Sequence, residues 1–96
     1  MDEMLDQAVA EINRRVAGRG FDGTAMFVLT GVGSIFLDRG EARKGEGPAE
    51  VTFTATPDTF QGILAGAVNP TSAFMSGKLA VDGDMGAAMR LASALA

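Results

Sequence analysis

The order of hydrophobic and polar positions predicts a helix at the start of the chain. Between Met1 and Gly18, apolar side chains recur every three or four residues and polar ones occupy the other side, which is the pattern of an amphipathic helix. Acidic residues open this segment and Arg14 and Arg15 close it, an order that complements the helix dipole. The stripe that we expect to be buried consists of Leu5, Val9, Ile12 and Val16.

The following part of the chain changes to the alternation that is typical of strands. Thr24–Thr30 and Ser34–Asp38 are short apolar runs separated by Gly31-Val32-Gly33, which predicts a hairpin. The polar run Glu41–Lys44 predicts a short edge strand. In Glu50–Ala55, apolar residues alternate with threonines, so we expect a strand with one buried face.

Helix signals return in the last part of the chain. Thr56-Pro57-Asp58 and Asn69-Pro70 each place Pro directly after a good N-cap residue, and each therefore predicts the start of a helix. A strand is expected over Lys78–Asp82, and Asp84 is expected to cap a final helix. The predicted apolar stripe of that helix is Met85, Ala88, Met89, Ala92 and Leu95. The predicted order is α-β-β-β-β-α-α-β-α, an α+β fold with helices on one face of a mostly antiparallel sheet.

Composition limits the chemistry that such a fold can perform. The chain has no His, Cys, Trp or Tyr, which excludes a histidine base, a thiolate nucleophile, a disulfide and a zinc site of nitrogen and sulfur ligands. Ser76 and Lys78 lack the spacing of Ser-x-x-Lys enzymes, and Gly31-Val32-Gly33 lacks the third glycine of a dinucleotide fingerprint. We therefore expect no metal site and no cofactor, and an enzyme is the least favoured class of function.

Length and charge point to one intracellular domain. Ninety-six residues suit a single domain, here residues 1–96, and a hydrophobic fraction of 47% is too high for a disordered chain. The net charge of −4 disfavours a nucleic-acid partner. No apolar run approaches the ~20 residues of a membrane span, and the acidic N-terminus does not resemble a signal peptide. We expect a cytoplasmic protein with at most transient membrane contact, and the oligomeric state stays open.

Methionine and phenylalanine are the informative part of the composition. Six of each supply large and adaptable apolar side chains. From composition alone, an ordinary core is the simpler interpretation. The other interpretation is a cavity, because small residues such as Gly66, Ala87 and Ala88 fill little volume along the later helices. Periodicity does not distinguish the two.

A longer pattern follows in the C-terminal half. The segment Asn69–Gly86 contains Asn-Pro, Ala-Phe, Gly-Lys-Leu and Gly-Asp-Met-Gly in that order, and Met89–Leu91 continues it. This pattern resembles the signature of the sterol carrier protein 2 (SCP2) family, and the strand Ala49–Thr54 resembles that family too. The resemblance is close over residues 49–91 and holds only in element order before them. It implies a five-stranded sheet covered by helices, an apolar tunnel, and binding of a fatty acid, an acyl-CoA or a sterol-like lipid without catalysis.

The resemblance also implies which residues meet the ligand. The residues that we expect to line the tunnel are Phe27, Phe36, Phe53, Phe60, Leu64, Phe74, Met75, Met85 and Met89. Arg14, Arg15 and Arg19 are candidates for contact with an anionic headgroup, although a solvated basic cluster at a helix end is the simpler interpretation.

Three points stay open at this level. The C-terminal Ala94-Leu95-Ala96 differs from the Ser-Lys-Leu peroxisomal address of some eukaryotic members, so the resemblance favours the stand-alone type that bacteria carry. Because the chain is short for this family, a packed core without a tunnel is an alternative. A regulatory or interaction module whose apolar groove binds a partner helix is the alternative function.

Overall fold

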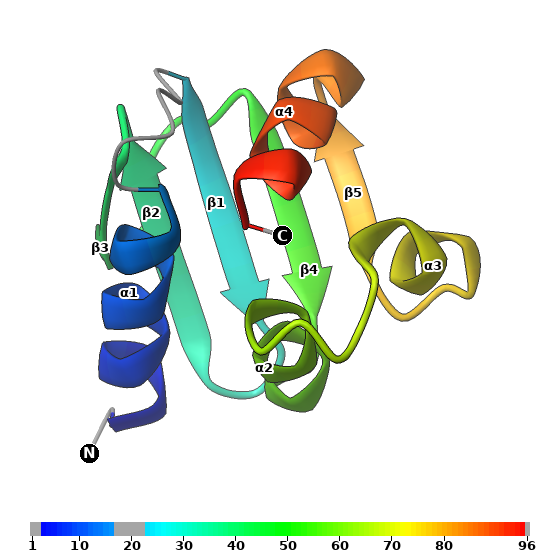
Figure 1. The fold of residues 1–96 in the computed structure, drawn as a ribbon. Coiled ribbons are helices and arrows are strands. Elements are labelled where there is room, and N and C mark those ends of the chain that lie inside the picture. The colour runs from blue at the N-terminus through cyan, green and yellow to red at the C-terminus, as the bar shows by residue number, and fades with distance from the viewer. Residues whose placement is uncertain (1–2, 17–22, 96) are drawn as a thin grey trace.

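The computed structural model describes residues 3–16 and 23–95, and its elements follow the predicted order (Figure 1). The helices are α1 (Glu3–Val16), α2 (Pro57–Leu64), α3 (Pro70–Met75) and α4 (Met85–Leu95). The strands are β1 (Thr24–Leu29), β2 (Gly33–Asp38), β3 (Glu41–Lys44), β4 (Val51–Ala55) and β5 (Ala80–Gly83). They form one five-stranded sheet in the order β3-β2-β1-β4-β5, in which β1 and β4 are parallel and the other neighbours are antiparallel. The predicted α+β fold class is confirmed.

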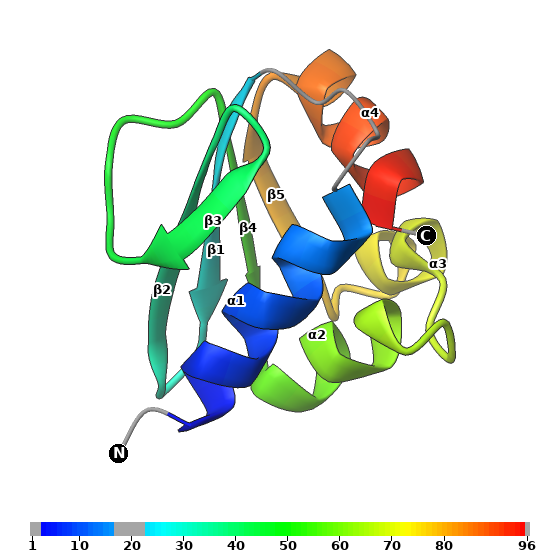
Figure 2. The same cartoon turned by 60° about the vertical axis from the view of Figure 1, so that its left-hand side comes forward.

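All four helices lie on the same face of the sheet (Figures 1 and 2). Alternation along β1 and β4 produces this layering, because every second residue of each strand is buried. Phe27 of β1 is paired with Phe53 of β4 in the parallel register, so the two rings point to the same side. The hydrophobic core therefore lies between the helices and this face of the sheet.

Helix α1 is fixed to the edge strand β3. The side-chain amide of Asn13 donates to the carbonyl oxygen of Ala42 at 3.1 Å and accepts from the Ala42 N–H at 2.7 Å. Asp6 and Lys44 form an ion pair at 2.9 Å between the same two elements. Because these contacts hold one side of α1 to β3, its other side faces α2 (Figure 2).

The three predicted N-caps are present and set where the later helices begin. The Thr56 hydroxyl accepts from a backbone N–H three residues on at 3.2 Å. The Asn69 side chain accepts from two backbone N–H groups, at 2.8 and 3.2 Å. Asp84 accepts from the N–H of Gly86 at 2.9 Å. Each side chain satisfies donors that an α-helix leaves unpaired at its first turn.

The buried stripe of α4 differs in part from the predicted one, since Ala88 belongs to both and the side chain of Leu95 lies outside the described residues. The buried side chains are Ala87, Ala88, Leu91 and Ala94, whereas Met85 and Met89 are 48% and 70% exposed. Since Arg90 and Ser93 are the only polar residues between Met85 and Leu95, hydrophobic periodicity does not define one face of this helix. Small side chains let α4 lie close to the sheet, and the larger methionines are left outside.

Phe36 lies on the face of the sheet that points away from the helices. It alternates with Ile35 and Leu37, which belong to the core between the layers. The guanidinium carbon of Arg43 lies 5.0 Å from the centre of the Phe36 ring. The loop after β3 covers the ring, and a Cβ atom at Gly47 would approach it to 2.9 Å. Phe36 is therefore buried, but by this loop and not by the helices.

Candidate functional site

A small apolar cavity lies between the helices and the sheet. Its free volume is about 20 Å³, which is room for roughly one water-sized sphere and far below the ~300 Å³ at which ligand pockets begin. Its lining residues are Ala8, Ile12, Phe27, Leu29, Ile35, Phe53, Phe60, Ile63, Leu64, Pro70, Leu79 and Ala92. The interior is thus packed, and the described residues around its residual space are all apolar.

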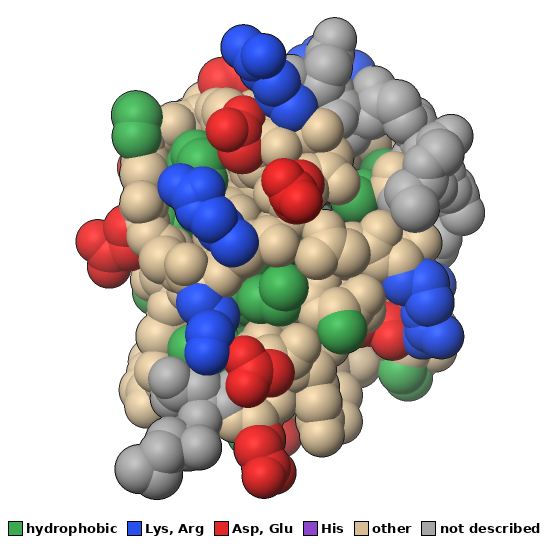
Figure 3. All heavy atoms as spheres, turned by 90° about the vertical axis from the view of Figure 1, so that its left-hand side faces the viewer, with side chains coloured by type: hydrophobic (Ala, Val, Ile, Leu, Met, Phe, Trp, Pro, Cys, Tyr) green, Lys and Arg blue, Asp and Glu red, His purple; other side chains and the backbone are tan. Residues whose placement is uncertain are grey.

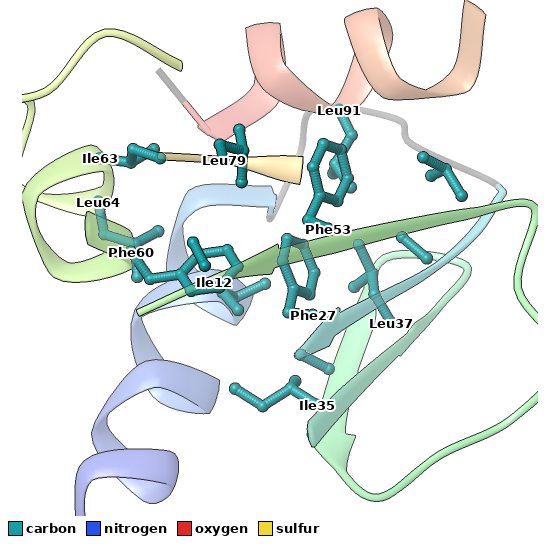
Figure 4. Close-up of a cluster of buried hydrophobic side chains, with 14 of the residues drawn as sticks. Ile12, Phe27, Ile35, Leu37, Phe53, Phe60, Ile63, Leu64, Leu79 and Leu91 are labelled. Atoms are coloured by element: carbon teal, nitrogen blue, oxygen red, sulfur yellow. The ribbon is translucent and has the colours of Figure 1, made fainter. Parts of the chain in front are cut away.

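Three aromatic rings occupy the centre of this region (Figure 4). The rings of Phe27 and Phe53 are stacked, with centroids 5.4 Å apart and planes 13° apart. Phe60 of α2 meets Phe27 edge to face, at 5.8 Å and 78°. Such aromatic pairs add to the stabilisation that burial of their area provides. The cluster joins α2 to the middle of the sheet.

A larger cleft opens between α1 and α2. Its volume is about 630 Å³, which falls within the range of ligand-binding clefts. The residues that line it are Glu3, Met4, Gln7, Ala8, Glu11, Arg14, Arg15, Leu29, Pro57, Phe60, Gln61, Leu64 and Ala65. Four of them also line the inner cavity: Ala8, Leu29, Phe60 and Leu64. These four residues, here called the throat, separate the wide outer cleft from the small apolar interior.

Charged groups of α1 form an ion-pair cluster in the cleft. The Nε of Arg15 lies 3.0 Å from one carboxylate oxygen of Glu11, and Arg14 pairs with the other oxygen. These hydrogen bonds, first from Arg15 and then from Arg14, hold the pKa of Glu11 below its usual value. Glu11 is therefore ionised at neutral pH. Arg15 also donates to the backbone carbonyl oxygen of Leu64, so it connects α1 to the end of α2.

The structure brings together some of the predicted tunnel residues and separates others. The predicted residues that line the cavity are Phe27, Phe53, Phe60 and Leu64. The predicted residues that lie elsewhere are Phe36, behind the sheet, and Phe74, Met75, Met85 and Met89, which are exposed on α3 and α4. In α3, only Ala73 is buried, because the helix is short and a single position faces the core. That any of the predicted tunnel residues contacts a ligand stays a prediction from the sequence.

Of the three residues predicted to contact an anionic headgroup, the two that the structure describes lie at the cleft. Arg14 and Arg15 line it on the α1 side. Arg19 falls outside the described residues. The predicted role in binding an anionic group stays a prediction.

Several aliphatic residues that line the cavity, among them Ile12 and Leu29, are not among those predicted from the sequence. Two signals were nevertheless available. Ile12 stands on the predicted buried stripe of the first helix, and Leu29 lies two residues after Phe27 in a strand that alternates. The throat residue Ala8 carries no comparable signal, since a small residue on a helix face suits either surface.

The outer surface beside α1 mixes both signs of charge. Figure 3 shows Lys and Arg next to Asp and Glu, with hydrophobic side chains between them.

Among the described residues, no three or more carboxylates gather in a way that would hold a metal ion. Within the same residues, no helix combines the length and the apolar character needed to cross a membrane.

Comparison with known proteins decides the family. The model of the SCP-2 sterol transfer family matches residues 2–96. The chain belongs to the SCP-2 sterol transfer family. Within it, hydroxysteroid dehydrogenase-like protein 2 of Xenopus laevis is 39% identical over 98 residues, which cover 91% of this chain and 24% of that protein. Sterol carrier protein 2 of Homo sapiens is 32% identical, over 95% of this chain and 17% of that protein. The chain thus spans a quarter or less of these relatives.

A solved SCP-2 structure shares the architecture. The solution structure of sterol carrier protein 2 from Aedes aegypti, in complex with the C16 fatty acid palmitate, is 25% identical. The two superpose with a TM-score of 0.81, over all of this chain and 97% of that one. The family and the fold predicted from the sequence are confirmed.

Proposed function

We propose that this SCP-2 domain binds a long-chain lipid between its helices and its sheet and carries that lipid without altering it. The ligand classes are a fatty acid, an acyl-CoA or a sterol-like lipid. The observation that carries the proposal is the throat, where the wide cleft between α1 and α2 meets an interior whose described lining residues are all apolar. The palmitate complex of the Aedes aegypti relative supports a fatty acid as one such ligand.

The packed interior means that the lipid must displace side chains. Phe60 and Leu64 of α2 stand at the throat, and their movement away from the sheet would join the cavity to the cleft. A buried 16-carbon chain gains about 12 kcal/mol, at about 0.8 kcal/mol per methylene. Association costs at least about 4 kcal/mol. At most about 8 kcal/mol remains before the cost of opening, which corresponds to micromolar affinity at best.

The polar end of the lipid would remain in the cleft. Arg14 and Arg15 line the α1 side of the cleft, and guanidinium groups bind carboxylates and phosphates well. We propose that they contact an anionic headgroup when one is present. Glu11 pairs with both of them, so such a headgroup would compete with it.

Delivery of a lipid also needs a surface that meets a membrane. Four of the large exposed hydrophobic side chains lie on α3 and α4, which flank β5 (Figure 1): Phe74, Met75, Met85 and Met89. Lys78 and Arg90 lie in the same part of the chain, and neither has a carboxylate within ion-pair distance among the described residues. Exposed apolar groups beside free cations suit transient contact with an anionic membrane.

Thermal unfolding with palmitate tests the proposed function. A ligand that binds only the folded state at 100 times its Kd adds about 2.7 kcal/mol to the free energy of unfolding, which for a domain of this size raises Tm by about 11–22 °C. Butyrate, which keeps the carboxylate but lacks the long chain, is the matched control and should leave Tm unchanged. If palmitate acts no differently from butyrate, the carrier proposal is contradicted and the cleft is better interpreted as a groove for a partner helix.

A further inference from the structure

Charged groups of both signs on α1 line the cleft between α1 and α2. Among the described residues, the charged ones that line it are two carboxylates, Glu3 and Glu11, and two guanidinium groups, Arg14 and Arg15. Glu11 pairs with both guanidinium groups, one on each carboxylate oxygen. About a quarter of the Glu11 side chain and about three-tenths of the Arg15 side chain are exposed. The ion pair between them is therefore partly shielded from water. Arg14 and Arg15 therefore share Glu11 as a counter-ion.

Uncharged hydrogen-bonding groups stand on both walls of the same cleft. Gln7 on α1 and Gln61 on α2 are lining residues. Neither side-chain amide has a hydrogen-bond partner among the described residues. A side-chain amide offers both donors and an acceptor, so it can bind a hydroxyl group or an ester carbonyl without any change of charge.

We propose that Glu11 makes this cleft select lipids with an uncharged polar headgroup, such as a hydroxyl or an ester, over lipids that end in a free carboxylate. The inference rests on the proposed function and specifies its ligand class. A carboxylate headgroup that binds the half-buried Arg15 must either displace Glu11 from it or lie beside that second negative charge, and both are unfavourable. An uncharged headgroup leaves the cluster of Glu11, Arg14 and Arg15 intact. It can instead form hydrogen bonds with the side-chain amides of Gln7 and Gln61.

Two ligands with the same chain and different headgroups test this selection. Palmitate and hexadecanol each have 16 carbons, and their dissociation constants are measured at pH 7 by displacement of the uncharged fluorescent probe diphenylhexatriene. In the unmodified protein, hexadecanol should bind more tightly than palmitate. Glu11→Gln should lower the ratio of the palmitate Kd to the hexadecanol Kd at least about threefold, the size expected for a partly exposed ion pair. Arg15→Ala should raise that ratio.

The control is Asp6→Asn, which lies on the same helix outside the cleft lining and also removes one carboxylate from an ion pair. It should leave the ratio unchanged. The inference is overturned if palmitate binds the unmodified protein more tightly than hexadecanol, or if Glu11→Gln changes the ratio no more than Asp6→Asn does. If neither ligand displaces the probe, the proposed function fails as well as this inference. If both ligands displace the probe but the ratio does not respond to Glu11→Gln, only this inference fails.

Discussion

Replacing Phe27 with alanine is expected to lower the free energy of unfolding by about 3–5 kcal/mol, the range for removal of a buried phenylalanine. Phe27 is 1% exposed and contacts Phe53 and Phe60 through its ring. Its loss would leave a hole where three elements meet. Because small domains are stable by only about 5–15 kcal/mol, a large share of the stability depends on this side chain. Urea unfolding followed by circular dichroism measures the change.

Phe74→Ala is the matched control, since it makes the same substitution at a side chain that is 44% exposed on α3. We expect it to cost less than about 1 kcal/mol. The Phe27→Ala variant should also regain part of its stability in saturating palmitate, because the lipid chain can fill the enlarged interior. Equal costs for the two variants would show that the aromatic cluster is not the centre of the core.

Filling the throat is expected to abolish most lipid binding. Ala8 is half-buried on α1 and belongs to both the cleft and the inner cavity. A phenylalanine at this position would occupy the path between them, and we expect Ala8→Phe to weaken palmitate binding at least about tenfold, the loss of roughly two buried methylenes. The Kd is measured by probe displacement, as for the headgroup comparison.

Ala10→Phe provides the control for this variant. Ala10 lies on the same helix, is exposed, and lines neither space, so palmitate should bind the Ala10→Phe variant as it binds the unmodified protein. Unimpaired binding by Ala8→Phe would mean that the lipid does not pass between α1 and α2.

Local signals in the sequence predicted the fold because each acts over a few residues. The side chains of Thr56, Asn69 and Asp84 satisfy unpaired N–H groups close by in the chain, so their effect is visible without any tertiary structure. Gly83 is another residue whose role is local, because it is required by the conformation of the backbone at its own position. Its φ is +114°, and a Cβ atom there would lie 2.3 Å from the carbonyl oxygen of Glu50. The segment that resembles the SCP2 signature thus encodes caps and turns around β5.

Which side of a strand or helix faces the core was harder to predict than whether a segment forms a strand or a helix. In β2, the run Ile35-Phe36-Leu37 is apolar on both faces, and only the loop at Gly47 explains why Phe36 is buried away from the helices. In α4, apolar residues surround the helix, so the choice of buried stripe depends on how closely the helix approaches the sheet. Both cases turn on packing between segments far apart in the chain.

The cleft could not be predicted from the sequence for the same reason. It exists because Asn13 holds α1 against β3 while Arg15 reaches the end of α2. These contacts join residues between 29 and 49 positions apart. The predicted residues Phe27, Phe53 and Phe60 meet at the centre of the interior, but how they pack depends on those distant contacts.

The proposed function requires that a lipid chain enters the space between the helices and the sheet. Nuclear Overhauser effects between carbon-13-labelled palmitate and the protein test it most directly. We expect contacts from the methyl end of palmitate to the rings of Phe27, Phe53 and Phe60. Contacts confined to the exposed side chains of Phe74, Met75 and Met89, or no contacts at saturating palmitate, would contradict it.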